Sequence, residues 1–165
     1  MKFNFYALRA IYLHEMDRFR RTLLQSLLSP VLSTSLYFIV FGSVIGDYVE
    51  SIDGLSYGSY IVPGLLMLTL LTQSISNTSF GIFFPKFNGT IYEILAAPIS
   101  TFEVVLAFVG AGATKTLIVG VVIFITSLFF VDVTVKYPLL MIFLLVLVAF
   151  TFALFGFLIG LMSSN

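Results

Sequence analysis

The chain has 165 residues, of which 59% are hydrophobic and only 10% are charged. A soluble globular domain has about 25% charged residues, so this composition cannot supply a water-facing surface. The formal net charge is zero and cysteine is absent, so nucleic acid is not an expected partner and thiol chemistry is excluded.

The charged residues are confined to a few short segments. No Asp, Glu, Lys or Arg occurs in the intervals 22–46, 54–85 and 137–165, and a shorter uncharged stretch covers 116–131. A membrane-spanning helix needs about 20 mostly apolar residues. The sequence therefore predicts an all-α integral membrane protein with four transmembrane helices.

Residues 1–21 are predicted to form a helix that lies at the membrane surface. Aromatic and aliphatic side chains alternate there with charged ones, and an amphipathic helix with a basic polar face lies in the interface. His14, the only histidine, is interpreted as a polar residue of this helix and not as a catalytic base. No small-residue cleavage pattern follows, so a cleaved signal peptide is not expected.

The apolar stretches place the spans at about 22–45, 57–84, 104–130 and 138–162. Pro30 lies within the first span, and Pro63-Gly64 is expected to break the second near its start. An acidic loop, 46–56, should join the first two spans, and a tight loop, 131–137, should join the last two.

Orientation is predicted from the Lys and Arg residues of the short loops. The N-terminal segment carries five of them and the connection 85–103 adds Lys86, whereas the two opposite loops together contain only Lys136. We therefore expect a multi-pass protein of the cell (inner or plasma) membrane with a cytoplasmic N-terminus.

The sequence leaves two depths open for Lys115. If the third helix enters the membrane at Val104, the ammonium lies about 16 Å deep, where a lysine is costly and is usually functional or paired. If residues 99–114 lie near the interface instead, the crossing begins at Lys115 and its side chain reaches outward.

The sequence gives little support for catalysis. Residues 110–116 superficially resemble a phosphate-binding loop, but Val109 and Thr114 stand where the motif needs glycine. No His, Asp and Glu cluster has the spacing of a metal site. Neither a cofactor nor a metal is expected on this chain.

A polar stripe is predicted along one face of the second span. Its members follow the i, i+3, i+4, i+7, i+8 spacing of a helix face and are Thr69, Thr72, Gln73, Ser76 and Asn77. Such a stripe must face another helix or water. It either forms hydrogen bonds between helices or is a candidate lining of a translocation path.

Close helix packing is predicted for the fourth span. Gly156 and Gly160 form a small-xxx-small pair, which lets two membrane helices approach closely. The motif is common, so it indicates packing and not a particular partner.

The connection 85–103 contains the signals of a short helix. Asn88-Gly89 indicates a turn, and Thr90 with Glu93 matches the capping-box spacing. We expect a helix at about 88–100, on the cytoplasmic side, between the second and third spans.

With these features in place, the chain resembles the permease subunit of ABC-2 type transporters along its whole length. The resemblance rests on the basic residues that end the first helix, on Pro63-Gly64-Leu65, and on the stretch 88–100 followed by Glu103. It implies that residues 88–100 form the coupling helix of an exporter. The residues that it assigns to ATPase coupling are Gly89, Thr90, Glu93, Leu95, Pro98, Ser100 and Glu103.

The resemblance also implies partners. A separate ABC ATPase subunit would bind ATP and Mg, a second permease copy would complete a homodimer, and lipid would surround both. Residues 1–21 would be a connecting helix, and 22–165 would be a partial transmembrane domain. The domain would be partial because the family usually has six spans, and this chain is therefore expected to be a fragment. The substrate, a drug, lipid or glycan precursor, stays open.

Two other functions are compatible with four spans. A structural or assembly protein would tolerate leucine throughout the polar stripe. An ion-coupled secondary transporter would be expected to have paired charges or broken inverted repeats within its spans, and no span contains an acidic partner for Lys115.

Overall fold

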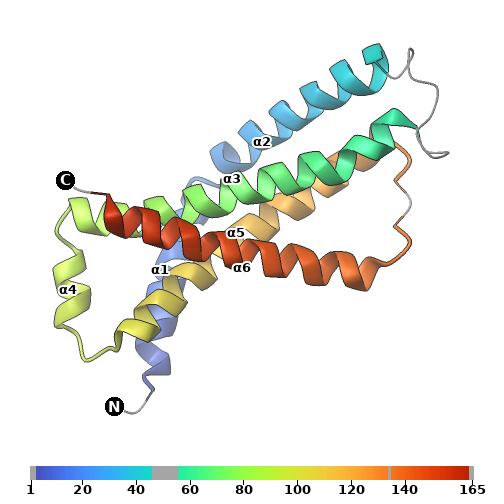
Figure 1. Ribbon diagram of the computed structural model, residues 1–165. Coiled ribbons are helices and arrows are strands. Elements are labelled where there is room, and N and C mark those ends of the chain that lie inside the picture. The colour runs from blue at the N-terminus through green and yellow to red at the C-terminus, as the bar shows by residue number, and fades with distance from the viewer. Residues whose placement is uncertain (1–2, 46–55, 134, 164–165) are drawn as a thin grey trace.

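The computed structural model describes residues 3–45, 56–133 and 135–163, and all the regular elements in these ranges are helices. Within them, four segments are long and apolar enough to cross a membrane, namely Leu23–Phe41, Tyr57–Phe87, Thr101–Leu128 and Pro138–Met162. In Figure 1 these segments lie alongside one another, and the helices of residues 5–21 and 91–96 lie toward one end of them. The predicted all-α membrane fold is confirmed.

The N-terminal helix and the first span are separate helices that meet at Thr22. α1 comprises Phe5–Arg21 and α2 comprises Leu23–Tyr37, which continues as a π-helix, η1, over Phe38–Ile45. Thr22 has a backbone outside helical geometry (φ −107°, ψ 13°), and this allows the chain to change direction. The predicted acidic loop lies outside the described residues, apart from its last residue.

α3 is one uninterrupted helix from Tyr57 to Phe87. Ser56 caps its start by accepting a hydrogen bond from the amide of Ser59. The prediction that Pro63-Gly64 breaks this span is wrong, because membrane helices tolerate proline where neighbouring groups satisfy the freed carbonyl. The helix also continues three residues past the predicted end.

The connection between α3 and the next span contains a short helix, as predicted, but a smaller one. Gly89 has a positive φ of 78°, which turns the chain, and α4 covers only Ile91–Ala96. α5 then runs over Thr101–Leu128. Its start contains the capping box, in which Ser100 accepts from the amide of Glu103 while the Glu103 carboxylate accepts from the amide of Ser100. The capping box predicted for Thr90 and Glu93 is wrong, since the Thr90 side chain caps nothing.

α6 covers Pro138–Met162, as predicted, with Pro138 in the first turn. α3 packs against both α5 and α6, and α2 packs against α5. A Cβ at Gly156 would lie 2.5 Å from the carbonyl oxygen of Ile75. The predicted close packing of α6 is therefore confirmed, with α3 as the partner helix.

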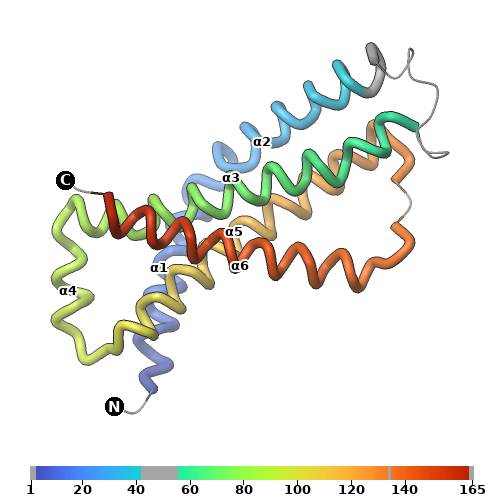
Figure 2. The backbone as a smooth tube through the Cα atoms, viewed as in Figure 1, coloured from blue at the N-terminus to red at the C-terminus, as the bar shows by residue number. Residues whose placement is uncertain are grey.

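Hydrogen bonds from one lysine join the ends of α3 and α6. The ammonium of Lys86, near the end of α3, donates to the carbonyl oxygen of Leu161 at 2.7 Å and to that of Ser163. These carbonyls lie at the end of α6, where helical partners are missing, and a cation stabilises that end of the dipole. Figure 2 shows the two ends close to each other near the C-terminus.

Candidate functional site

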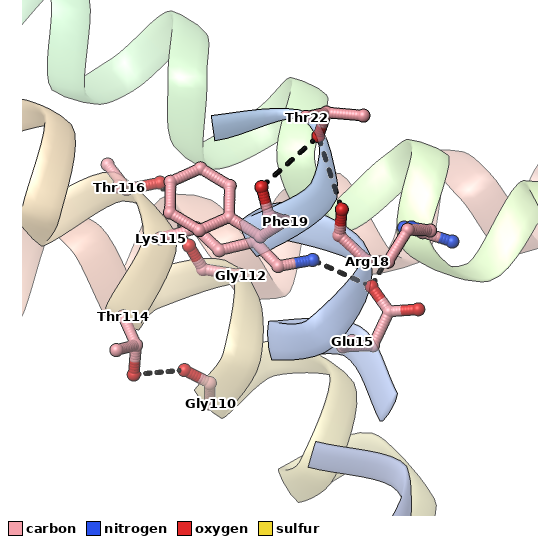
Figure 3. A network of polar contacts seen from close by, with 9 residues as sticks. All are labelled: Glu15, Arg18, Phe19, Thr22, Gly110, Gly112, Thr114, Lys115 and Thr116. Atoms are coloured by element: carbon pink, nitrogen blue, oxygen red, sulfur yellow. Dashed lines mark hydrogen bonds and ion pairs between the residues drawn. The ribbon is translucent and has the colours of Figure 1, made fainter. Parts of the chain in front are cut away.

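A buried ion pair joins α1 to α5. The ammonium of Lys115 donates to Oε2 of Glu15 at 2.8 Å, and the side chains are only 4% and 2% exposed. Figure 3 shows both side chains in the space between the two helices. Lys115 therefore has an acidic partner that the sequence did not reveal, supplied by the N-terminal helix and not by another span.

The ion pair is one of three contacts that hold α1 parallel to the first half of α5. The amide of Asn4 donates to the carboxylate of Glu103, and the hydroxyl of Tyr12 donates to Thr114 Oγ1 at 3.1 Å. Residue numbers rise together along both helices at these contacts, so the helices run in the same direction (Figure 1). α1 thus packs along a spanning helix, and its position at the membrane surface stays a prediction.

Glu15 has a second cation as partner. The guanidinium of Arg18 donates to the same Oε2 at 2.8 Å and lies 5.9 Å from the ring centroid of Phe84 in α3. The other carboxylate oxygen, Oε1, is buried with no hydrogen-bond partner among the described residues. One carboxylate therefore stands between two cations that come from α1 and α5.

α3 forms the third wall of this charge cluster, and two glycines allow its approach. A Cβ at Gly81 would lie 3.4 Å from Glu15 Oε2. A Cβ at Gly112 of α5 would overlap the hydroxyl of Thr78, another buried oxygen with no partner in the described chain. The cluster thus lies where three helices meet.

The structure shows the partner of Lys115, and the two predicted depths stay open. α5 is already helical at Thr101, so the Lys115 backbone lies about 21 Å along it. Its ammonium, however, meets Glu15 beside Gly81 of α3. Gly81 lies only five residues before Lys86, which is near the end of α3. The charge is buried in protein near the α4 end of the bundle, and its depth in a bilayer stays a prediction.

The pairing of Glu15 is not among the predictions from the sequence, although its position in α1 carries a signal. Ile11, Glu15 and Phe19 are spaced by four residues, so they share one face of α1. Ile11 and Phe19 pack into the hydrophobic core of the bundle. A carboxylate on that face needs a buried cation, and Lys115 is the one lysine in an apolar stretch.

The residues assigned to ATPase coupling differ in how far their side chains are exposed. No residue of α4 is buried, and Thr90, Glu93, Leu95 and Pro98 are all exposed. Glu103 is only 2% exposed, and it is held by the capping box and the amide of Asn4. Glu103 thus fixes the start of α5, and its role in ATPase coupling stays a prediction.

The predicted polar stripe of α3 lies at the edge of the packed side of that helix, and Thr69, Gln73 and Asn77 are half-buried. Thr72 and Ser76 are exposed, and the Thr72 hydroxyl bonds to a carbonyl of its own helix. The bond between helices comes from Ser74, which is outside the stripe and donates to the carbonyl of Ala149 at 2.6 Å. The amide nitrogen of Asn77 is buried and unpartnered among the described residues.

Comparison with known proteins identifies the family. Residues 6–165 match the ABC-2 type transporter family. The chain belongs to this family. One relative, the inner membrane transport permease YadH of Escherichia coli K12, is 38% identical over 159 residues, and the same values hold for YadH of E. coli O157:H7 and of Shigella flexneri. No solved structure matches significantly.

The match covers 96% of this chain but 62% of each YadH sequence, so the ABC-2 chain described here spans less than two thirds of its curated relatives. The resemblance found from the sequence is confirmed by the family match. α2, α3, α5 and α6 are therefore helices of an ABC-2 membrane domain. Among the described residues, no three His, Cys, Asp or Glu side chains are grouped as a metal site would require.

Proposed function

We propose that the chain is the membrane-spanning permease subunit of an ATP-driven exporter. ATP and Mg would bind to a separate ABC ATPase subunit, and two permease copies would assemble with it. The name of its YadH relatives supports transport across an inner membrane. The count of basic residues supports a cytoplasmic location of α1 and α4.

The observation that carries this proposal is the exposure of α4. This six-residue helix projects from the bundle between two spanning helices (Figure 2). Tyr92 and Leu95 are 73% and 61% exposed, although both are apolar enough to be buried in a partner. A short helix with exposed apolar side chains, fixed at both ends, is suited to dock into a groove of the ATPase.

Two contacts would transmit a movement of α4 to the helices in the membrane. The capping box joins the end of the connector to α5, and the Glu15–Lys115 pair joins α5 to α1. Movement of α4 by the ATPase would therefore tilt α5 and α1 together. The polar stripe of α3, in which Thr72 and Ser76 are exposed, is the proposed lining of the path for a drug, lipid or glycan-type substrate.

The test is co-purification of the chain with a candidate ATPase, followed by measurement of ATP hydrolysis. Glu93→Ala should weaken the complex or its stimulated hydrolysis about tenfold, the effect of losing about 1.4 kcal/mol at an interface. Asp132→Ala is the matched control, because it also removes an exposed acid, but from the connection between α5 and α6. Normal binding and stimulation by the folded Glu93→Ala variant would overturn the proposal.

A further inference from the structure

A cavity of about 420 Å³ lies between α3, α5 and α6, at the end of the bundle opposite α4. The first turns of α3, Phe124 of α5 and the first turns of α6 form its walls, and the connection between α5 and α6 borders it. Small-molecule sites have volumes of about 300–1,000 Å³. The cavity is thus large enough for a ligand, and the charge cluster and the coupling connector do not include it.

The wall of this cavity is apolar, with side chains such as Val62, Leu66 and Met141. Leu140 and Leu144, which also line it, are 59% and 40% exposed on the outside of α6. Because the outer faces of these spans are apolar, the medium at this opening is expected to be lipid hydrocarbon and not water. The occupant must therefore be apolar over most of its length.

The rim of the cavity has a cationic group. Lys136 is exposed, and its ammonium lies 5.6 Å from the ring centroid of Tyr137. Both ion pairs of the described residues are made by Glu15, so Lys136 has no carboxylate partner in that part of the chain. The hydroxyl of Ser59, also at the rim, is already used to bond the carbonyl of Asp132 at 3.0 Å. Lys136 is the cation among the residues that line the cavity, and it is placed to hold an anion.

We propose that this cavity binds one acyl chain of an anionic phospholipid, with the lipid phosphate on Lys136. A lysine beside a tyrosine at the end of a span is the arrangement found at the membrane–water interface, where headgroups lie. An ammonium at the level of the headgroups favours anionic lipids over zwitterionic ones, because in an anionic lipid no headgroup cation balances the phosphate charge. The site would thus select lipid by charge at the rim and exclude water along the apolar wall. It is independent of the proposed transport function.

The chain contains no tryptophan, so a single introduced tryptophan reports from one place only. Phe124→Trp puts the reporter in the cavity, Met141→Trp gives a second reporter in case the first variant does not fold, and Phe155→Trp puts the control on the outside of α6. Each full chain is reconstituted in phosphatidylcholine vesicles that contain either brominated phosphatidylglycerol or brominated phosphatidylcholine at the same mole fraction. Quenching of tryptophan fluorescence measures the contact between bromine and the reporter.

Quenching of the cavity reporter should be several-fold stronger with brominated phosphatidylglycerol than with brominated phosphatidylcholine. The Phe155→Trp control should be quenched equally by both lipids, and Lys136→Gln should abolish the preference at the cavity. Equal quenching of the cavity reporter by the two lipids would overturn the proposal, as would a preference that survives Lys136→Gln. Quenching of the control alone would also overturn it, because the cavity would then be covered by protein, such as a second copy.

Discussion

Glu15 and Lys115 lie 100 residues apart in the chain, yet their charged atoms meet at 2.8 Å in the interior of the bundle. Neither side chain is more than 4% exposed. A buried charge without a partner is expensive in a protein and more so in a membrane. The two residues therefore depend on each other, and this dependence can be measured.

Removal of one member of this pair should destabilise the protein strongly. We expect Glu15→Gln to lower the free energy of unfolding by about 3–5 kcal/mol, because the ammonium of Lys115 is left buried without its carboxylate. Reversible unfolding in detergent micelles measures the change. The double variant Glu15→Gln/Lys115→Met should recover most of the loss, and additive losses in the double variant would contradict a direct pairing.

The contact of α6 with α3 should be intolerant of even one methyl group. We expect Gly156→Ala to destabilise the bundle by about 1–3 kcal/mol, because the new Cβ would lie 2.5 Å from a carbonyl oxygen of α3. Gly64→Ala is the matched control, since a Cβ there has no neighbour within 4 Å. Equal melting temperatures for the two variants would disprove this packing.

The start of α5 should depend on Ser100, whereas the start of α4 should not depend on Thr90. Ser100→Ala removes an N-cap and should cost about 1 kcal/mol, with faster amide hydrogen exchange in the first turn of α5. Thr90→Ala should leave exchange in α4 unchanged, because that side chain makes no cap hydrogen bond. Faster exchange in the Thr90→Ala variant would restore the capping box that the sequence suggested.

Two serines of α3, two residues apart, should respond differently to leucine. Ser74→Leu should destabilise the fold by about 1–3 kcal/mol, since Ser74 is fully buried and donates to a carbonyl of α6. Ser76→Leu should change stability by less than about 0.5 kcal/mol, because Ser76 is exposed. Thermal unfolding of both variants in detergent checks the prediction, and a large loss for Ser76→Leu would place that residue in a contact.

The four spans could be predicted from the sequence because long apolar stretches in a chain with few charges have few alternatives. The bounds of α6 agree with the prediction. The capping box was assigned incorrectly because two segments match its pattern, and only backbone geometry distinguishes them. Ser100 has the extended backbone that a cap needs (φ −79°, ψ 150°), whereas Thr90 is helical (φ −61°, ψ −20°).

The candidate site was harder to predict for a different reason. Helical spacing identified the polar stripe of α3, but spacing does not tell which face of a helix meets its neighbours. The structure places Ser74 toward α6 and leaves Thr72 exposed. Likewise, the sequence identifies Lys115 as a costly charge but offers no acidic partner within the spans, because Glu15 comes from α1.

The separation of the ion pair along the chain has a consequence for synthesis. A ribosome adds about 5–20 residues per second, so Glu15 emerges about 5–20 seconds before Lys115. During that interval two spans are inserted while α1 lacks the helix against which it packs. Until α5 is inserted, the carboxylate has only Arg18 of its own helix as a cationic partner. Insertion of α5 supplies the second cation and the surface on which α1 packs, so the first helix to be made is among the last to reach its final position.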